Sequence, residues 1–372
     1  MKVSRVVIGV LLCAVVQVTP AIASPTMIRL GYADCAACHV SPQGGGLLTS
    51  YGRGVDVAQS ARARDIPPSD ADSRRYLYDL RLVAVGQQAN AMASHTSTTS
   101  STFQVQLRNS LRLSDRHRLT YTLGLSGATV PTSATQTGRS VEVIVPKAIW
   151  EYRPKHGIEL SAGREELPTG VGLPDPQAYM RKSTDPGTTV YPTQIKAFVY
   201  THRLQLTPFV FGPGGDEDPR LQQWGAGALA GVDVWKQRAV VGVSLLDSQS
   251  PAFDRRSVGA YARLGFGRWG ILAQHELTGR SSTAADSLTT QYVSGHTQVF
   301  FAAKEWLVTS LGTEELIVDG LTQSRAYRLA PGVQLRASEN LTVSFTLRDT
   351  FAGAAKGRSR TYSVLAAVKT VK

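Results

Sequence analysis

Residues 103–113 read Phe103-Gln104-Val105-Gln106-Leu107-Arg108-Asn109-Ser110-Leu111-Arg112-Leu113, with apolar side chains at nearly every odd position and polar ones at every even position. The same period of two recurs from Leu119 to Ser126 and from Leu341 to Arg348. Successive side chains of a β-strand point to opposite faces, so each stretch predicts a strand with one apolar and one polar face. The pattern favours an all-β chain.

Similar stretches fill the chain from residue 75 to its end. About sixteen of them lie near 75–86, 102–114, 118–127, 140–153, 158–167, 194–202, 204–212, 222–235, 238–247, 256–265, 269–278, 290–302, 306–318, 325–337, 341–349 and 360–371. Their connections alternate in length: Gln87 to Ser101 is long, Asp115 to His117 is short, and Pro168 to Pro192 is very long. Short turns on one side and long loops on the other are typical of outer-membrane barrels.

We therefore expect residues 75–372 to form an antiparallel transmembrane β-barrel of about 16 strands, with its apolar face on outer-membrane lipid and its polar face on a lumen. A barrel of 14 strands stays open as an alternative, because the stretch 204–212 follows its neighbour with almost no turn signal. A water-soluble β-sandwich is the other alternative, since its strands also have one apolar face.

The composition narrows the class of protein further. The chain has 372 residues, of which 42% are hydrophobic and only 18% charged, which excludes a disordered chain. Its formal charge is +12. The arginines are spread over the polar phase of the strands, at Arg81, Arg108, Arg112, Arg263, Arg328, Arg336 and Arg348. We expect them to line the lumen and to bind no nucleic acid.

The first 23 residues predict a signal peptide. Lys2 and Arg5 precede an apolar run from Val6 to Val16, and Ala21-Ile22-Ala23 offers a small-x-small cleavage site. An uncleaved anchor is the alternative, although the run is short for a membrane span. We expect export of the mature chain.

The motif Cys35-Ala36-Ala37-Cys38-His39 is the C-x-x-C-H pattern of covalent c-type haem attachment. Two thiols of this spacing bond to the haem vinyl groups, and the adjacent imidazole ligates the iron. We expect one haem c on Cys35 and Cys38, with His39 as the proximal iron ligand. A disulfide, a thioredoxin-like redox pair and a zinc site are the alternatives.

The residues around this motif supply further candidates. Leu48 and Tyr51 are expected to cover a haem face, and Arg53 to bind a haem propionate; the alternative is a flexible turn followed by a short helix. Met27 is the candidate distal iron ligand. Other options for this ligand are Met92, Met180, His95, His117 and His156. The haem-binding segment, residues 24–74, is too short to be stable alone, so we expect it to dock at or in the lumen.

An exported C-x-x-C-H motif, followed by Pro42, Leu48-Thr49, Gly52-Arg53 and a porin-sized β domain, resembles the outer-membrane monohaem cytochrome–porin fusions. The resemblance implies electron transfer across the outer membrane, between an extracellular donor or acceptor, with Fe(II) as one candidate, and periplasmic electron-carrier cytochromes. The chain is then an electron carrier or an iron oxidase. The alternative is a diffusion porin for small anions, with a structural or redox-responsive haem plug.

Overall fold

The computed structural model describes residues 25–32, 35–40, 47–62, 75–91, 96–131, 137–170, 191–201, 203–214, 222–283, 289–320, 323–352 and 358–371. The predicted signal peptide, residues 1–23, lies outside this part of the chain. So do Pro42 and three candidates for the distal iron ligand, Met92, His95 and Met180.

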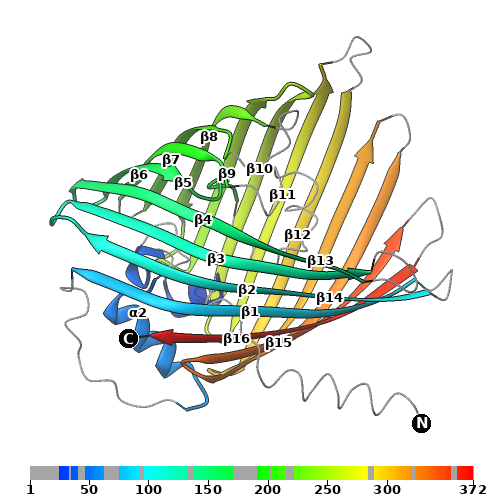
Figure 1. Ribbon diagram of the computed structural model, residues 1–372, viewed down its shortest axis with the longest axis horizontal. Coiled ribbons are helices and arrows are strands. Elements are labelled where there is room, and N and C mark those ends of the chain that lie inside the picture. Colours follow the sequence, from blue (N-terminus) through cyan, green and yellow to red (C-terminus); the bar gives the residue numbers. More distant parts are fainter. Residues whose placement is uncertain are drawn as a thin grey trace.

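Sixteen antiparallel strands form a closed barrel in which each strand pairs with its neighbours in sequence and β1 pairs with β16 (Figure 1). The strands are β1 (Tyr76–Ala91), β2 (Thr96–Arg112), β3 (His117–Pro131), β4 (Thr137–Lys155), β5 (Ile158–Arg164), β6 (Thr193–Tyr200), β7 (Leu204–Gly212), β8 (Trp224–Asp233), β9 (Ala239–Gln249), β10 (Phe253–Phe266), β11 (Trp269–Ser282), β12 (Thr289–Lys304), β13 (Leu307–Asp319), β14 (Ser324–Ser338), β15 (Leu341–Ala352) and β16 (Arg358–Val371). The predicted barrel and its count of sixteen strands are confirmed. β7 is a separate strand, which rules out the alternative of 14.

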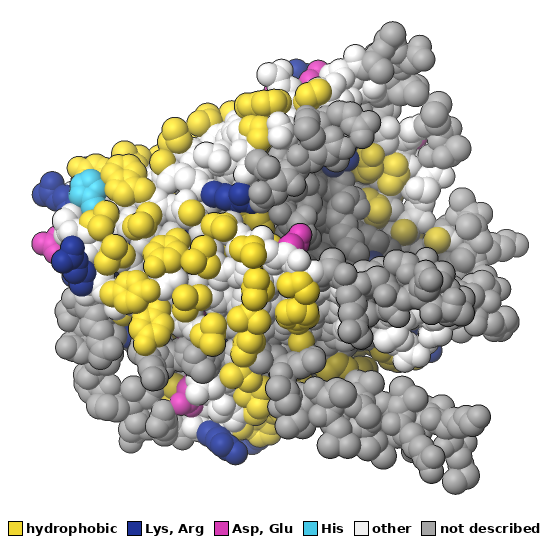
Figure 2. Space-filling model, in the orientation of Figure 1, with side chains coloured by type: hydrophobic (Ala, Val, Ile, Leu, Met, Phe, Trp, Pro, Cys, Tyr) yellow, Lys and Arg dark blue, Asp and Glu magenta, His cyan; other side chains and the backbone are white. Residues whose placement is uncertain are grey.

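The side chains of β9 illustrate how the two faces differ. Val241, Val243 and Leu245 are exposed on the outside, whereas Ser244 and Ser248 between and beyond them are buried on the lumen side. Figure 2 shows hydrophobic side chains spread over the outer face of the barrel. An apolar outer belt around a polar interior is the arrangement that a lipid-embedded barrel requires.

Aromatic side chains gather near the short turns. Trp150 stacks on His117 with ring centroids 5.5 Å apart, and Trp269 packs on Phe301 at 4.6 Å. Both tryptophans are exposed on the barrel surface. Aromatic rings prefer the boundary between lipid and water, so these residues mark one edge of the apolar belt.

Several strands are longer than the apolar alternation predicts. β1 continues to Ala91 and β2 begins at Thr96, so most of the loop expected between Gln87 and Ser101 is paired strand. These extensions are rich in Ser, Thr and Gln on both faces, so they carry no alternating pattern. Threonine nevertheless favours strands, and the ladder of backbone hydrogen bonds continues without an apolar face.

In the described part of the chain before the barrel, the structure has three short helices: the 3₁₀ helices η2 (Pro25–Leu30) and η3 (Cys35–Ala37), and the α-helix α2 (Ser50–Ala58). In Figure 1 they lie, in blue, at the barrel end that carries the short turns. None of the helices in the described part of the chain combines the length and the apolar character needed to cross a bilayer.

The lipid-facing role of the outer belt is testable at Val243, which lies at mid-strand in β9. We expect Val243→Arg to lower the free energy of unfolding by about 2–4 kcal/mol, because an arginine near the bilayer centre loses its hydration. The measurement is urea unfolding from phospholipid vesicles.

The control for Val243→Arg is Asn340→Arg, which adds the same side chain at an exposed position between β14 and β15. Equal stability of both variants would show that Val243 does not face lipid.

Candidate functional site

Residues 25–32, 35–40 and 47–62, called the plug below, pack against the inner wall at the short-turn end of the barrel. Ile28 is 2% exposed and belongs to an apolar cluster with inward-facing residues of five strands. The other members of this cluster are Val240, Tyr261, Leu272, Phe300, Ala302 and Val308. A second cluster joins Val40 and Leu47 of the plug to Leu77 of β1. The plug therefore contacts the wall on opposite sides of the lumen.

Close backbone contact and polar bonds hold the plug in this position. A Cβ atom at Gly265 of β10 would lie 2.3 Å from the carbonyl oxygen of Ile28, so glycine is required there for the plug to approach the wall. The buried guanidinium of Arg29 bonds the Glu305 carboxylate at 2.5 Å. Arg336 of β14 donates to the Gln59 side chain at 2.8 Å, and its carbonyl accepts from the Ala61 N–H at 2.8 Å.

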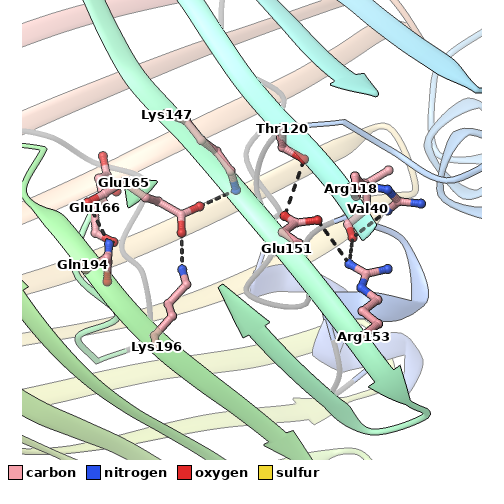
Figure 3. A network of polar contacts seen from close by, with 10 residues as sticks. All are labelled: Val40, Arg118, Thr120, Lys147, Glu151, Arg153, Glu165, Glu166, Gln194 and Lys196. Atoms are coloured by element: carbon pink, nitrogen blue, oxygen red, sulfur yellow. Dashed lines mark hydrogen bonds and ion pairs between the residues drawn. The ribbon is translucent and has the colours of Figure 1, made fainter. Parts of the chain in front are cut away.

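Two arginines of the wall bond the residue that follows the motif histidine (Figure 3). Arg153 of β4 donates to the Val40 carbonyl at 2.6 Å, and Arg118 of β3 donates to the same oxygen at 3.5 Å. Arg153 is itself held by Glu159 at 2.5 Å and by Glu151 at 3.6 Å. Since the Val40 backbone is directly joined to His39, this network fixes the chain beside the motif.

The motif itself forms one tight turn. Cys35 lies in η3, and its carbonyl accepts from the N–H groups of Cys38 at 3.2 Å and His39 at 2.9 Å. Both cysteines are partly exposed thiols, whereas His39 is buried and forms an antiparallel bridge with Leu48. Thiols three residues apart on a helical turn lie on one side of it. This spacing fits the two attachment points of a c-type haem.

The helix after the motif packs directly on it. The Thr49 hydroxyl caps α2 by accepting from the Gly52 N–H at 3.0 Å, and the Thr49 N–H donates to the Cys38 carbonyl at 3.0 Å. A Cβ atom at Gly52 would lie 2.0 Å from that same carbonyl oxygen. The Leu48-Thr49 and Gly52-Arg53 elements of the sequence therefore shape the turn that carries Cys38.

The other predicted site residues have the following contacts. Arg53 donates to the Leu48 carbonyl at 3.4 Å. The Met27 sulfur accepts from the Gln59 amide at 3.3 Å, which places it beside the end of α2. Tyr51 is 52% exposed and its hydroxyl bonds that of Tyr32. This hydrogen bond and burial raise the pKa of Tyr32 to about 12, so Tyr32 stays protonated at neutral pH.

Two further candidates for the distal ligand lie elsewhere. His117 stacks between β3 and β4 against Trp150 and Tyr152, and His156 is exposed in a short turn. The identity of a distal ligand therefore stays a prediction.

Residues 165–170, called the inner loop below, fold into the lumen after β5, at the start of the very long connection expected from Pro168 to Pro192. The Glu165 carboxylate lies between the ammonium groups of Lys147 and Lys196 and bonds both (Figure 3). Leu167 packs on an apolar cluster of the β7–β9 wall, and Gly170 contacts the Gln274 side chain on β11. The inner loop thus narrows the lumen.

Glu165 stays ionised in this position. Burial by itself would raise the pKa of its carboxyl group, but Lys147 and Lys196 outweigh burial and hold the pKa at about 2. Gln194 supports the same segment, since its amide donates to the carbonyls of Glu165 at 2.9 Å and Glu166 at 3.0 Å. The inner loop was invisible to sequence analysis, because no motif distinguishes a loop that folds inward from one that faces water.

The predicted inward arginines line the lumen and are engaged there. Arg108 bonds Asp79 with one contact at 2.6 Å, and Arg328 bonds Glu314 at 3.0 Å. Arg81 and Arg263 instead donate to the neutral side chains of Gln106 and Gln205, at 3.2 and 3.5 Å. These two bonds satisfy guanidinium hydrogen-bond donors without cancelling the positive charge.

Comparison with known proteins places the fold. No protein-family profile matches the chain, and no curated sequence matches it. Among solved structures, a loop-deleted OmpT of Vibrio cholerae has a TM-score of 0.58 at 9% identity, over 80% of this chain and 100% of that one. An anion-selective porin from Comamonas acidovorans has a TM-score of 0.57 at 12% identity, and the match covers 80% of this chain and 99% of that one. The outer membrane channel DcaP of Acinetobacter baumannii has a TM-score of 0.56 at 10% identity, and the match covers 80% of this chain and 97% of that one. The chain has the barrel fold of outer-membrane proteins.

A pair of glycines in α2 tests the contact between the helix and the motif. We expect Gly52→Ala to weaken the packing of the plug by about 1–3 kcal/mol, because the added methyl group overlaps the Cys38 carbonyl. The measurement is hydrogen exchange of the backbone amides of residues 49–60.

Gly54→Ala is the matched control, since a Cβ atom there has nothing within 4 Å. Because alanine has a higher helix propensity than glycine, we expect Gly54→Ala to stabilise α2 by up to about 1 kcal/mol and so to slow the exchange of its amides. Similar effects of both substitutions would contradict the close approach at Gly52.

The inner loop has an expected pH dependence. The carboxyl of Glu165 has a pKa lowered from 4.5 to about 2 in the folded state. Its contribution to the stability of the inner loop is therefore complete above pH 4.5 and is lost as the pH falls through about 2. Amides of the inner loop should stay protected at pH 7 and lose protection near pH 2, in hydrogen exchange corrected for intrinsic rates. Glu165→Gln should lose this protection already at pH 7.

Glu142→Gln serves as the control for Glu165→Gln, because Glu142 is exposed. Protection that is unchanged in Glu165→Gln at pH 7 would remove the role of Lys147 and Lys196 in holding the inner loop.

Proposed function

We propose that the chain is an outer-membrane porin for small anions, whose periplasmic mouth is occupied by the plug, and that the plug carries one c-type haem. The observation that carries this proposal is the packing of the plug on the inner wall at the end of the short turns. Short turns face the periplasm in bacterial outer-membrane barrels. The plug would then separate the lumen from the periplasm.

Selectivity for anions is supported by the charge of the lumen. Arg81 and Arg263 donate hydrogen bonds to neutral glutamine side chains, and the whole chain has a formal charge of +12. A cleft lined by one sign of charge concentrates ions of the opposite sign. One solved structure with a similar fold is an anion-selective porin, which agrees with this reading although identity is only 12%.

The residues of the motif fit a c-type haem. Cys35 and Cys38 are accessible on one side of a turn, and His39 follows directly. A haem attached there supplies a reversible one-electron couple of its iron. Within the chain, Thr49 and Gly52 shape the turn, while Arg153 and Arg118 hold the backbone next to His39.

Electron transfer across the outer membrane is the second candidate function. It is favoured by the location of the C-x-x-C-H motif inside a barrel mouth and by the resemblance to monohaem cytochrome–porin fusions. Periplasmic cytochromes would exchange electrons with the plug from the short-turn side. Because the plug lies at that end only, an extracellular donor or acceptor such as Fe(II) would have to enter the lumen.

One set of liposomes tests both functions. The wild type should show a covalent haem in the pyridine haemochrome spectrum and a reversal potential that indicates preference for chloride over potassium. Cys35→Ala/Cys38→Ala should lack the haem and pass more chloride, because the plug loses a large apolar body.

The second function is tested with cytochrome c enclosed in the liposomes and a membrane-impermeant electron donor added outside. The measurement is the reduction of the enclosed cytochrome c. Reduction by the wild type but not by Cys35→Ala/Cys38→Ala supports electron transfer. A colourless wild type overturns the haem, and equal permeation of potassium and chloride overturns the anion porin.

A further inference from the structure

A cavity of about 190 Å³ lies at the short-turn end, where the turn between β2 and β3 meets β4. Its lining includes Arg112, Arg116, Arg118 and Arg153, and the acidic residue among the lining side chains is Asp115. The space is large enough for several water molecules. Positive charges on four arginines that line one small cavity repel one another, and a bound anion stabilises such an arrangement.

Three other short turns, at residues 267–268, 305–306 and 339–340, each carry a single charged residue. Arg112 and Arg118 are cross-strand partners in β2 and β3, so the register places like charges directly opposite each other. Like charges at such a pair destabilise a sheet unless another group compensates them.

The arginines also differ in how far the protein already neutralises them. Arg153 bonds Glu159 at 2.5 Å and lies 3.6 Å from Glu151, so its charge is compensated. Arg118 donates a hydrogen bond of 3.5 Å to the uncharged carbonyl of Val40. Arg116 is exposed in the turn, whose Ser114 hydroxyl accepts from the backbone N–H of Arg116 at 3.3 Å. The cavity therefore has a net positive lining.

We propose that this cavity is a binding site for an oxyanion, either phosphate or a carboxylate, at the periplasmic mouth. The planar guanidinium group pairs with two oxygens of such an anion at once, which makes arginine the preferred side chain for these ligands. Arg118 and Arg153 also bond the plug at Val40, so the bound anion lies next to the chain that follows His39. The site deepens the proposed anion porin by giving the anion a binding position.

The test is isothermal titration of inorganic phosphate into the lipid-free protein in a non-ionic detergent, at constant ionic strength. The haem-free chain, Cys35→Ser/Cys38→Ser, is the background for the variants below and should bind phosphate. Arg112→Gln/Arg116→Gln should bind it at least about tenfold more weakly, because two charge-assisted hydrogen bonds are lost.

Lys236→Gln/Arg268→Gln is the matched control, since it removes two positive charges from exposed short turns at the same end of the barrel. It should bind phosphate within about twofold of the haem-free background chain, because distant exposed charges are screened. Absence of phosphate binding by the haem-free protein, or equal weakening in both double variants, overturns the site.

A comparison of the haem-bearing protein with Cys35→Ser/Cys38→Ser identifies the source of the anion; this arm alone rests on the proposed haem. Phosphate binding to both proteins shows a site for a free anion. Binding to the haem-free variant alone shows that the haem's own carboxylates fill the cavity. Both outcomes support an oxyanion site, and a failure of haem attachment leaves the phosphate titration of the haem-free chain as a complete test.

Discussion

Hydrogen bonding of the backbone within lipid is the constraint on which the rest of this structure depends. Hydrocarbon offers no partner for an N–H or C=O group, so a sheet that crosses a bilayer must have no open edge. The pairing of β1 with β16, from Asp79 opposite Val371 to Ala91 opposite Ser359, removes that edge. Closure then divides every strand into a lipid face and a lumen face, and it brings residues from the two ends of the sequence side by side.

The lumen face of the barrel has a polar part and an apolar part, and each is satisfied by different contacts. Part of it is polar, and partners such as Asp79 with Arg108 and Glu314 with Arg328 satisfy one another across strands. At the short-turn end the inner wall is apolar around Tyr261 and Phe300, which would be costly to expose to water. The plug covers this surface with Ile28. The barrel thus provides the apolar contacts that a segment of this size cannot supply for itself.

Sequence analysis reached the barrel and its sixteen strands because alternation is a local signal that each strand carries independently. It missed the polar extensions of β1 and β2, which have no apolar face to reveal them. It also missed the inward course of the inner loop and the bond from Arg153 to Val40. These residues are 113 positions apart in sequence, and only the closed barrel makes them neighbours. Arg53 bonds Leu48 within the plug, and its bond to a haem propionate stays a prediction.

The anchoring of the plug also determines how the motif can be studied. The turn that carries Cys35 and Cys38 is shaped by Gly52 from within the plug, but its place is set by wall residues from strands that follow it in sequence. A peptide of residues 24–74 lacks Arg153 and Arg336, along with the apolar wall beneath Ile28. Attachment of a haem to such a peptide would therefore report the reactivity of the two thiols, whereas the surroundings of His39 exist only in the complete barrel.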